Sequence, residues 1–302
     1  MNNSKTSLFF QNIRYRLKAA VQHDHLILAS LALIIGLVAG GAVIGFRESI
    51  GWFQYLYYST DTERIYYELL IMPWWLIITI PTIGGLLVGI SAHYFLPERR
   101  PHGIPDVIEA YIRRSGHMSL KDGLTAAMVS AASIGCGAST GREGPAVHLG
   151  ASLAGWLTRR IHLSRALSRT ILGCGVSAAV AASFNAPIAG ALFASEVIVG
   201  HYALRSFAPI VISSVAGTAL TRSMYGDFPA FFVSNIRFES FWEFPAFILL
   251  GIFSAIVALF LMHSITFAKT ISNHIPGPPW YRPAIAGFFL GIIALLFPQV
   301  MG

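Results

Sequence analysis

The chain has 302 residues, of which 55% are hydrophobic and only 12% are charged. A soluble domain covers its core with about a quarter charged residues, so this composition excludes a soluble protein and makes lipid the solvent for most of the chain. The net charge of +7 comes from short blocks of Lys and Arg between apolar runs, where such residues set membrane topology, so we expect no nucleic-acid partner.

The first 46 residues predict a polar amino-terminal segment followed by one membrane helix. Residues 1–25 are polar and lack a signal-peptide cleavage site, and residues 26–46 carry no charge over a length of roughly 30 Å. The connection at 47–68 holds two basic and four acidic residues, whereas the connection at 97–122 holds five basic ones. The positive-inside rule therefore predicts a cytoplasmic amino terminus in a multi-pass protein of the inner cell membrane.

A second span is expected at about 69–96, and then the pattern changes. The apolar segments become shorter and are interrupted by Gly and Pro; they cover about 123–135, 145–157, 170–182, 187–200 and 206–221. Several are too short to cross a membrane alone. Irregular backbone at membrane depth is tolerated where protein covers it or where it lines an aqueous cavity, so these breaks indicate a pore or a transport site. Two longer segments follow, at about 244–268 and 283–300.

The two cysteines, Cys136 and Cys174, both fall inside apolar stretches. This placement supports neither an extracellular disulfide framework nor a metal site. We therefore expect two reduced, buried thiols and a protein without metal or cofactor.

The sharpest motif is Gly141-Arg142-Glu143-Gly144-Pro145, which follows a run of small residues at 135–140. Pro145 suits the first turn of a helix, and the glycines leave backbone N–H groups open to a ligand. Such a helix start favours anions, and a carboxylate there can compete with the anion until it is protonated. The alternative is an Arg142–Glu143 pair in a loop near the membrane surface.

Two further segments also predict helix starts. His102-Gly103-Ile104-Pro105 precedes a helix that runs towards Arg113, and Asn185-Ala186-Pro187 opens a helix over about 188–200. One such Gly or Pro turn is weak evidence, but three in a chain of broken apolar helices favour a transport site. Taken alone, His102 is more often an ordinary loop histidine.

Together, these three motifs resemble the CLC family of chloride channels and proton/chloride antiporters; the third reads Phe184-Asn185-Ala186-Pro187-Ile188-Ala189-Gly190. The resemblance implies an all-α integral membrane protein with an inverted-repeat fold of broken, tilted helices. It also implies a homodimer in which each subunit has its own path for chloride or a similar small anion. The expected division is a cytoplasmic segment 1–25, a first repeat 26–240 and the opening helices of an incomplete second repeat, 241–302.

The resemblance also implies roles for single residues. Glu143 is similar to the gating glutamate of the family, and the amides of Arg142, Glu143 and Gly144 would hold the anion on its outer side. The loop at His102 and Gly103 would line the inner part of the same path.

Two positions depart from the family pattern. His102 stands where the family usually has an anion-binding serine, which leaves a ring N–H donor but puts selectivity in doubt. Val197 stands where the antiporters carry a glutamate for internal protons, and Glu196 lies one residue earlier.

Valine cannot carry a proton, so the leading hypothesis is channel-like anion transport. The alternatives are proton-coupled exchange through Glu196 or a water wire, and a non-conducting scaffold. An intramembrane enzyme is disfavoured because the sequence has no matching catalytic motif.

Overall fold

The computed structural model describes residues 3–60, 65–227 and 240–301, with side chains from Leu26 onward. Every regular element within these ranges is helical, as the sequence predicts. The α-helices are α1 (Asn3–Tyr58), α2 (Tyr66–Leu69), α3 (Trp74–Phe95), α4 (Ile104–Arg113), α5 (Leu120–Gly135), α6 (Glu143–Arg160), α7 (Arg165–Phe184), α8 (Pro187–Phe193), α9 (Leu204–Tyr225), α10 (Glu243–His274) and α11 (Arg282–Leu296). The shorter turns are η1 (Pro97–Arg99), the π-helix η2 (Ala194–Val199), η3 (Pro279–Tyr281) and η4 (Pro298–Val300).

Six helices in the described ranges are long and apolar enough to cross a membrane. Two of them, α7 and α9, are longer than the apolar segments predicted from the sequence. Each helix continues beyond its apolar segment at both ends. The first span also continues past residue 46 to Tyr58. The segments α5, α6 and α8 are not among the six, in agreement with the expected broken helices.

Local sequence signals explain where several helices begin and end. Ser119 caps α5 by accepting a hydrogen bond from the N–H of Asp122, and Ser164 caps α7 in the same way. Asn185 ends α7 in the left-handed conformation, which Asn tolerates better than most residues. Pro187 then occupies the first turn of α8, where its missing N–H costs nothing.

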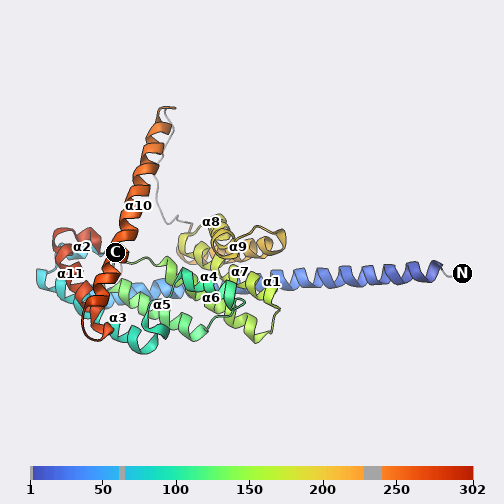
Figure 1. Cartoon of the computed structure of the whole chain (residues 1–302), viewed down its shortest axis with the longest axis horizontal. Helices are drawn as coiled ribbons and strands as arrows, with labels where there is room; N and C mark the ends of the chain where they lie inside the picture. The colour runs from blue at the N-terminus through green and yellow to red at the C-terminus, as the bar shows by residue number, and fades with distance from the viewer. Residues whose placement is uncertain (1–2, 61–64, 228–239, 302) are drawn as a thin grey trace.

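The core is centred on α7. Every residue from 171 to 182 in this helix is buried, and α6, α9 and the middle of α1 pack around it (Figure 1). Gly150 of α6 and Gly175 of α7 allow these two helices to approach closely, since a β-carbon at Gly150 would lie 2.7 Å from the Cβ of Ala179. Buried hydroxyls join α7 to α9: Ser213 donates to the carbonyl of Cys174 at 2.8 Å. Small residues and polar bridges of this kind hold helices together in lipid.

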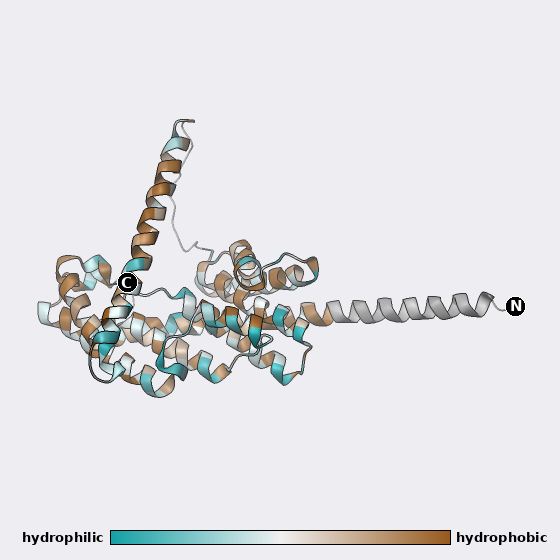
Figure 2. Cartoon of the chain, viewed as in Figure 1, coloured by the Kyte–Doolittle hydropathy of each residue, from teal (hydrophilic) through white to brown (hydrophobic). Residues whose placement is uncertain are grey.

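The last two long helices differ in how they pack. Gly85 and Gly89 of α3 allow α11 to lie directly against α3. In contrast, α10 stands away from the other helices, has no buried residue and is apolar along most of its length (Figures 1 and 2). Both cysteines are buried and unpaired, as the sequence predicts.

Candidate functional site

The start of α4 is fixed by a network of charges. Gly103 is the N-cap, and its N–H donates to the Asp106 carboxylate at 2.9 Å. The same carboxylate accepts from Nη2 of Arg100 at 2.6 Å, while Nε of Arg100 bonds Glu98 at 2.8 Å. Partial burial acts to raise the pKa of Asp106, but the hydrogen bonds from Arg100 and Gly103 outweigh it and hold the pKa at about 2. Asp106 is therefore an anion at physiological pH.

The start of α6 lies against the start of α4. Arg142 is the N-cap of α6 and Glu143 is its first residue. The position of the β-carbon that Gly144 lacks lies 3.8 Å from the Cα of Gly103. Two helix N-termini, from segments about 40 residues apart, thus meet backbone to backbone, and the positive ends of both helix dipoles share one region.

Two cavities flank this meeting point. The first, which we call the His102 cavity, has a volume of about 380 Å³ and is lined by His102 and Pro145 among others. The second, the Glu143 cavity, has a volume of about 580 Å³ and is lined by Arg142 and Glu143. Both are lined by Thr140 and Gly141, so these two residues form a shared wall.

Gly141 makes room for the carboxylate of Glu143. The Oε2 atom of Glu143 lies in the space that a β-carbon at Gly141 would take. A glycine is therefore required for this side-chain position, and the carboxylate rests directly on the wall between the cavities.

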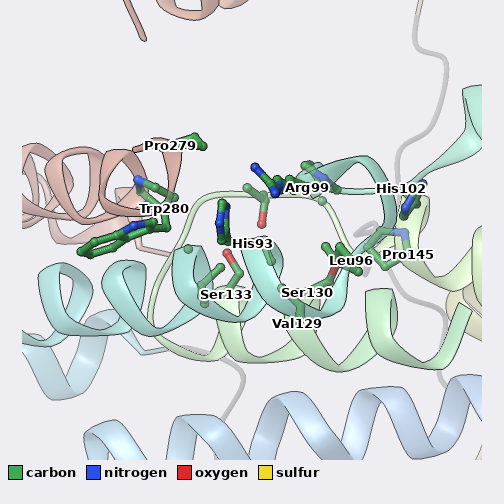
Figure 3. A pocket seen from close by; sticks show the side chains of 17 residues that line it. His93, Leu96, Arg99, His102, Val129, Ser130, Ser133, Pro145, Pro279 and Trp280 are labelled. Atoms are coloured by element: carbon green, nitrogen blue, oxygen red, sulfur yellow. The ribbon is translucent and has the colours of Figure 1, made fainter. Parts of the chain in front are cut away.

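The lining of the His102 cavity is mostly apolar, and several hydrogen-bond donors stand within it. Figure 3 shows His102 and Pro145 at one end, Trp280 at the other, and His93 and Arg99 between them. The hydroxyl-bearing residues Ser130 and Ser133 of α5 also contribute to the lining, which contains no carboxylate among the described residues. A cation, imidazoles and hydroxyls without a competing carboxylate suit a small anion.

Charges of both signs line the Glu143 cavity. Arg47 and Glu48 come from α1, Arg142 and Glu143 from the start of α6, and Tyr225 from the end of α9. The guanidinium of Arg47 stacks 4.3 Å above the Tyr225 ring, whose hydroxyl donates to the Glu48 carboxylate. When both glutamates are ionised, their charges balance those of Arg47 and Arg142. Protonation of Glu143 leaves the cavity lining with one net positive charge.

His148 belongs to none of the three sequence motifs, and it lies next to His102. The two rings are stacked with centroids 5.2 Å apart and planes 16° apart. A signal was available, because His148 is the one titratable residue in the apolar segment 145–157. Such residues inside membrane segments are often functional.

The third motif lies elsewhere. Asn185 accepts a hydrogen bond from Nε of Arg222 at 2.8 Å and donates to Asp227 at 3.4 Å, which ties the end of α7 to the end of α9. Phe184 packs against the core around α7, and Ala186 and Pro187 form the turn into α8. None of these residues lines the His102 or the Glu143 cavity.

Glu196 and Val197 are also outside both cavities. They lie in the π-helix η2 with exposed side chains, and the Tyr202 hydroxyl donates to Glu196 at 3.4 Å. The structure thus brings together the first two motifs and leaves these positions apart. In the described ranges, no group of three or more His, Cys, Asp or Glu side chains could hold a metal ion.

Comparison with known proteins gives consistent findings. A family model described as voltage gated chloride channel matches residues 84–302. The chain is 29% identical to a protein of Ralstonia nicotianae named as a ClcB-like chloride channel protein, over 90% of this chain and 64% of the relative. It is also 29% identical to the voltage-gated ClC-type chloride channel ClcB of Citrobacter koseri, over 90% of this chain and 66% of the relative.

Solved structures agree in fold. A slow cyanobacterial Cl−/H+ antiporter superposes with a TM-score of 0.74 at 19% identity, over 89% of this chain and 63% of its own. A CLC-type fluoride/proton antiporter gives 0.72 at 21% identity, over 91% of this chain and 66% of its own. The chain therefore has the fold of these transporters, and it spans just under two thirds of the length of these four proteins.

Proposed function

The chain belongs to the voltage-gated chloride channel family, and from this premise we propose that it moves chloride or a similar small anion across the membrane. The six apolar helices in the described ranges, together with its family, make it a multi-pass integral membrane protein. We place it in the inner cell membrane with the amino terminus in the cytoplasm, as the charge difference between its connections favours. We further propose that it acts as a homodimer with one path in each subunit.

One observation carries the proposal: the starts of α4 and α6 meet between two cavities that share a wall. Anions are stabilised at helix N-termini by unpaired N–H groups and by the helix dipole. The amides of Arg142, Glu143 and Gly144 would hold the anion on the side of the Glu143 cavity. His102, Gly103, Ile104 and Pro105 would form the inner part of the path, with His102 supplying a ring N–H in place of a hydroxyl.

Glu143 is proposed as the gate. Its carboxylate lies against Gly141 on the shared wall. An ionised carboxylate there occupies a place that suits an anion, and it also repels one. Protonation removes both obstacles, so anion movement should increase as the pH falls.

We propose channel-like movement, without proton coupling. Val197 cannot carry a proton, and neither Val197 nor Glu196 lines the two cavities. Proton-coupled exchange is the second candidate, favoured by the presence of an ionisable group, Glu196, on an exposed position of η2 and by the two antiporters that share the fold.

The test is chloride efflux from liposomes that contain the purified protein, measured with a chloride electrode over a range of pH. Efflux should exceed that of empty liposomes and should rise at acid pH. Glu143→Gln should flatten the pH profile. Glu109→Gln is the matched control, because Glu109 is partly exposed and pairs with Arg114 outside both cavities. No flux above empty liposomes would favour the non-conducting alternative.

A further inference from the structure

Four helix ends meet on one side of the molecule. The connection between α4 and α5 lies against the end of α6, since a β-carbon at Gly155 would lie 2.6 Å from the backbone N of Met118. The start of α7 joins the same junction, because Nη2 of Arg169 donates to the carbonyl of Ile112 at 2.9 Å. Residues from two distant segments therefore form one continuous surface.

This surface is strongly basic. It carries six exposed cations, which we call the basic face: Arg113, Arg114, Lys121, Arg159, Arg160 and Arg165. Glu109 pairs with Arg114 at 3.1 Å, and Asp122 is the one other carboxylate in the sequence segments 107–122 and 156–169. Two carboxylates cannot offset six cations, so the basic face attracts anions.

The start of α7 shows that the charges do not serve the helices alone. Arg165 is the first residue of α7, and the first turn of this helix has no acidic residue. A cation at a helix N-terminus is repelled by the helix dipole, so the helix itself favours an acidic residue there. The positive-inside rule requires cations near the end of a span but not at this position. The placement of Arg165 therefore indicates an anionic partner from outside the chain.

The setting of the basic face favours a phospholipid as that partner. Helix α7 is apolar and long enough to cross a membrane, so its first residue lies near the level of the headgroups. Apolar side chains stand among the cations: Ile112 is 61% exposed and Ile161 is 43% exposed. The guanidinium of Arg160 also lies 5.7 Å over the Trp156 ring. A free phosphate or a nucleic-acid backbone offers anionic groups alone, whereas a lipid also offers acyl chains to the apolar side chains.

We propose that the basic face binds the headgroup phosphates of anionic phospholipids, on the side of the membrane that the charge pattern makes cytoplasmic. Five of its six cations are arginines, whose parallel N–H groups match the oxygens of a phosphate. Phosphatidylglycerol should bind better than phosphatidylcholine, because the choline ammonium is repelled by the cations. None of the six residues lines the His102 or the Glu143 cavity, so the inference does not depend on the proposed anion transport.

The experiment adds lipids to the purified full chain in detergent at low salt. Thermal unfolding is followed by tryptophan fluorescence with phosphatidylglycerol, with phosphatidylcholine or with inorganic phosphate. A ligand that binds the folded state raises the unfolding midpoint. We expect phosphatidylglycerol to raise it by about 3 °C or more, and each of the other two additions by less than about 1 °C.

Two double variants locate the binding surface. In Arg159→Glu/Arg165→Glu, the rise caused by phosphatidylglycerol should fall to less than about half. The matched control is Arg205→Glu/Lys269→Glu, which reverses the same number of exposed charges outside the basic face and should keep the full rise. Each variant is compared with itself without lipid, so a change in its own stability does not affect the reading. If the first variant does not fold, Arg159→Gln/Arg165→Gln should show a smaller loss of the rise in the same direction.

Four results would overturn the proposal. The first is no rise with phosphatidylglycerol, and the second is an equal rise with phosphatidylcholine, which would indicate lipid stabilisation without headgroup recognition. The third is an equal rise with inorganic phosphate, which would make the basic face a site for free phosphate. The fourth is an equal loss of the rise in both double variants, because the overall charge of the chain would then attract the lipid.

Discussion

Arg100 and Asp106 form a two-pronged ion pair, with Nη2 2.6 Å from Oδ1 and Nη1 3.3 Å from Oδ2. This pair orients the Asp106 carboxylate, which accepts a hydrogen bond from the N–H of the N-cap residue Gly103. It therefore fixes the start of α4 at the point where this helix meets α6. A surface ion pair alone contributes little to the free energy of unfolding. One that also holds a helix cap fixes the position of the helix start, and here that start belongs to the proposed site.

Asp106→Ala should lower stability by about 1 kcal/mol, since it removes both the cap and the ion pair. Asp106→Asn should lower it less, because the amide oxygen still accepts from Gly103. Thermal unfolding in detergent, followed by tryptophan fluorescence, measures both. Equal stability of the wild type and Asp106→Ala would show that the cap does not hold α4.

The pH dependence of this effect has a definite sign. The pKa of Asp106 is lowered from 3.8 to about 2, so its ionised form contributes stability that is fully present above pH 3.8. The difference between the wild type and Asp106→Asn should therefore be the same at neutral pH and at about pH 4, and it should be lost as the pH falls through about 2. A difference that disappears already between neutral pH and pH 4 would contradict the assignment.

Gly141→Ala should open the proposed gate. The new methyl group would take the space that the Glu143 carboxylate occupies, and the carboxylate is the flexible partner that must move. We expect severalfold faster chloride efflux at neutral pH and a flatter pH profile. In a Glu143→Gln background the same change should add little, because two changes that act on one group are not additive. Unchanged efflux in the single variant would show that the carboxylate does not close the path from this position.

Gly150→Val should destabilise the crossing of α6 and α7. A side chain there overlaps the backbone of Gly175 and the Cβ of Ala179, and overpacking costs about 1–3 kcal/mol. The measurement is the temperature at which half of the protein is lost from the monodisperse peak in size-exclusion chromatography. Gly45→Ala is the matched control, since a β-carbon at Gly45 meets no atom within 4 Å. A loss of stability as large in Gly45→Ala would indicate that any change to a membrane glycine has this effect.

The sequence predicted the features that local chemistry determines. Gly103 and Pro145 mark the starts of α4 and α6 because glycine leaves backbone N–H groups open and proline fits the first turn of a helix. An uncharged run of about 20 residues predicts a span from its length alone. The boundaries of α7 and α9 were less predictable, since polar flanks of a membrane helix stay helical beyond the apolar run.

Contacts between distant segments could not be predicted in this way. His148 and His102 lie 46 positions apart in the sequence, and they meet only because α4 and α6 meet. The contact between Tyr225 and Glu48 joins α9 to α1 across an even longer separation. For Asn185 the motif was correctly placed at a helix start, but its bonds to Arg222 and Asp227 make it a tie between helix ends.

Proton coupling is tested by the pair Glu196 and Val197. If movement is channel-like, a chloride gradient should not drive uphill proton uptake into liposomes, as read by a pH-sensitive dye inside them. Glu196→Gln should then leave chloride flux unchanged, because this side chain is exposed and outside both cavities. Proton uptake that is stoichiometric with chloride in the wild type and lost in Glu196→Gln would instead make Glu196 the internal proton carrier. Val197→Glu is the informative third variant, because a carboxylate gained at this position should create coupling only if the position faces a proton path. Coupling that appears in Val197→Glu alone would support the assignment of Val197 to the position of the antiporters' internal glutamate.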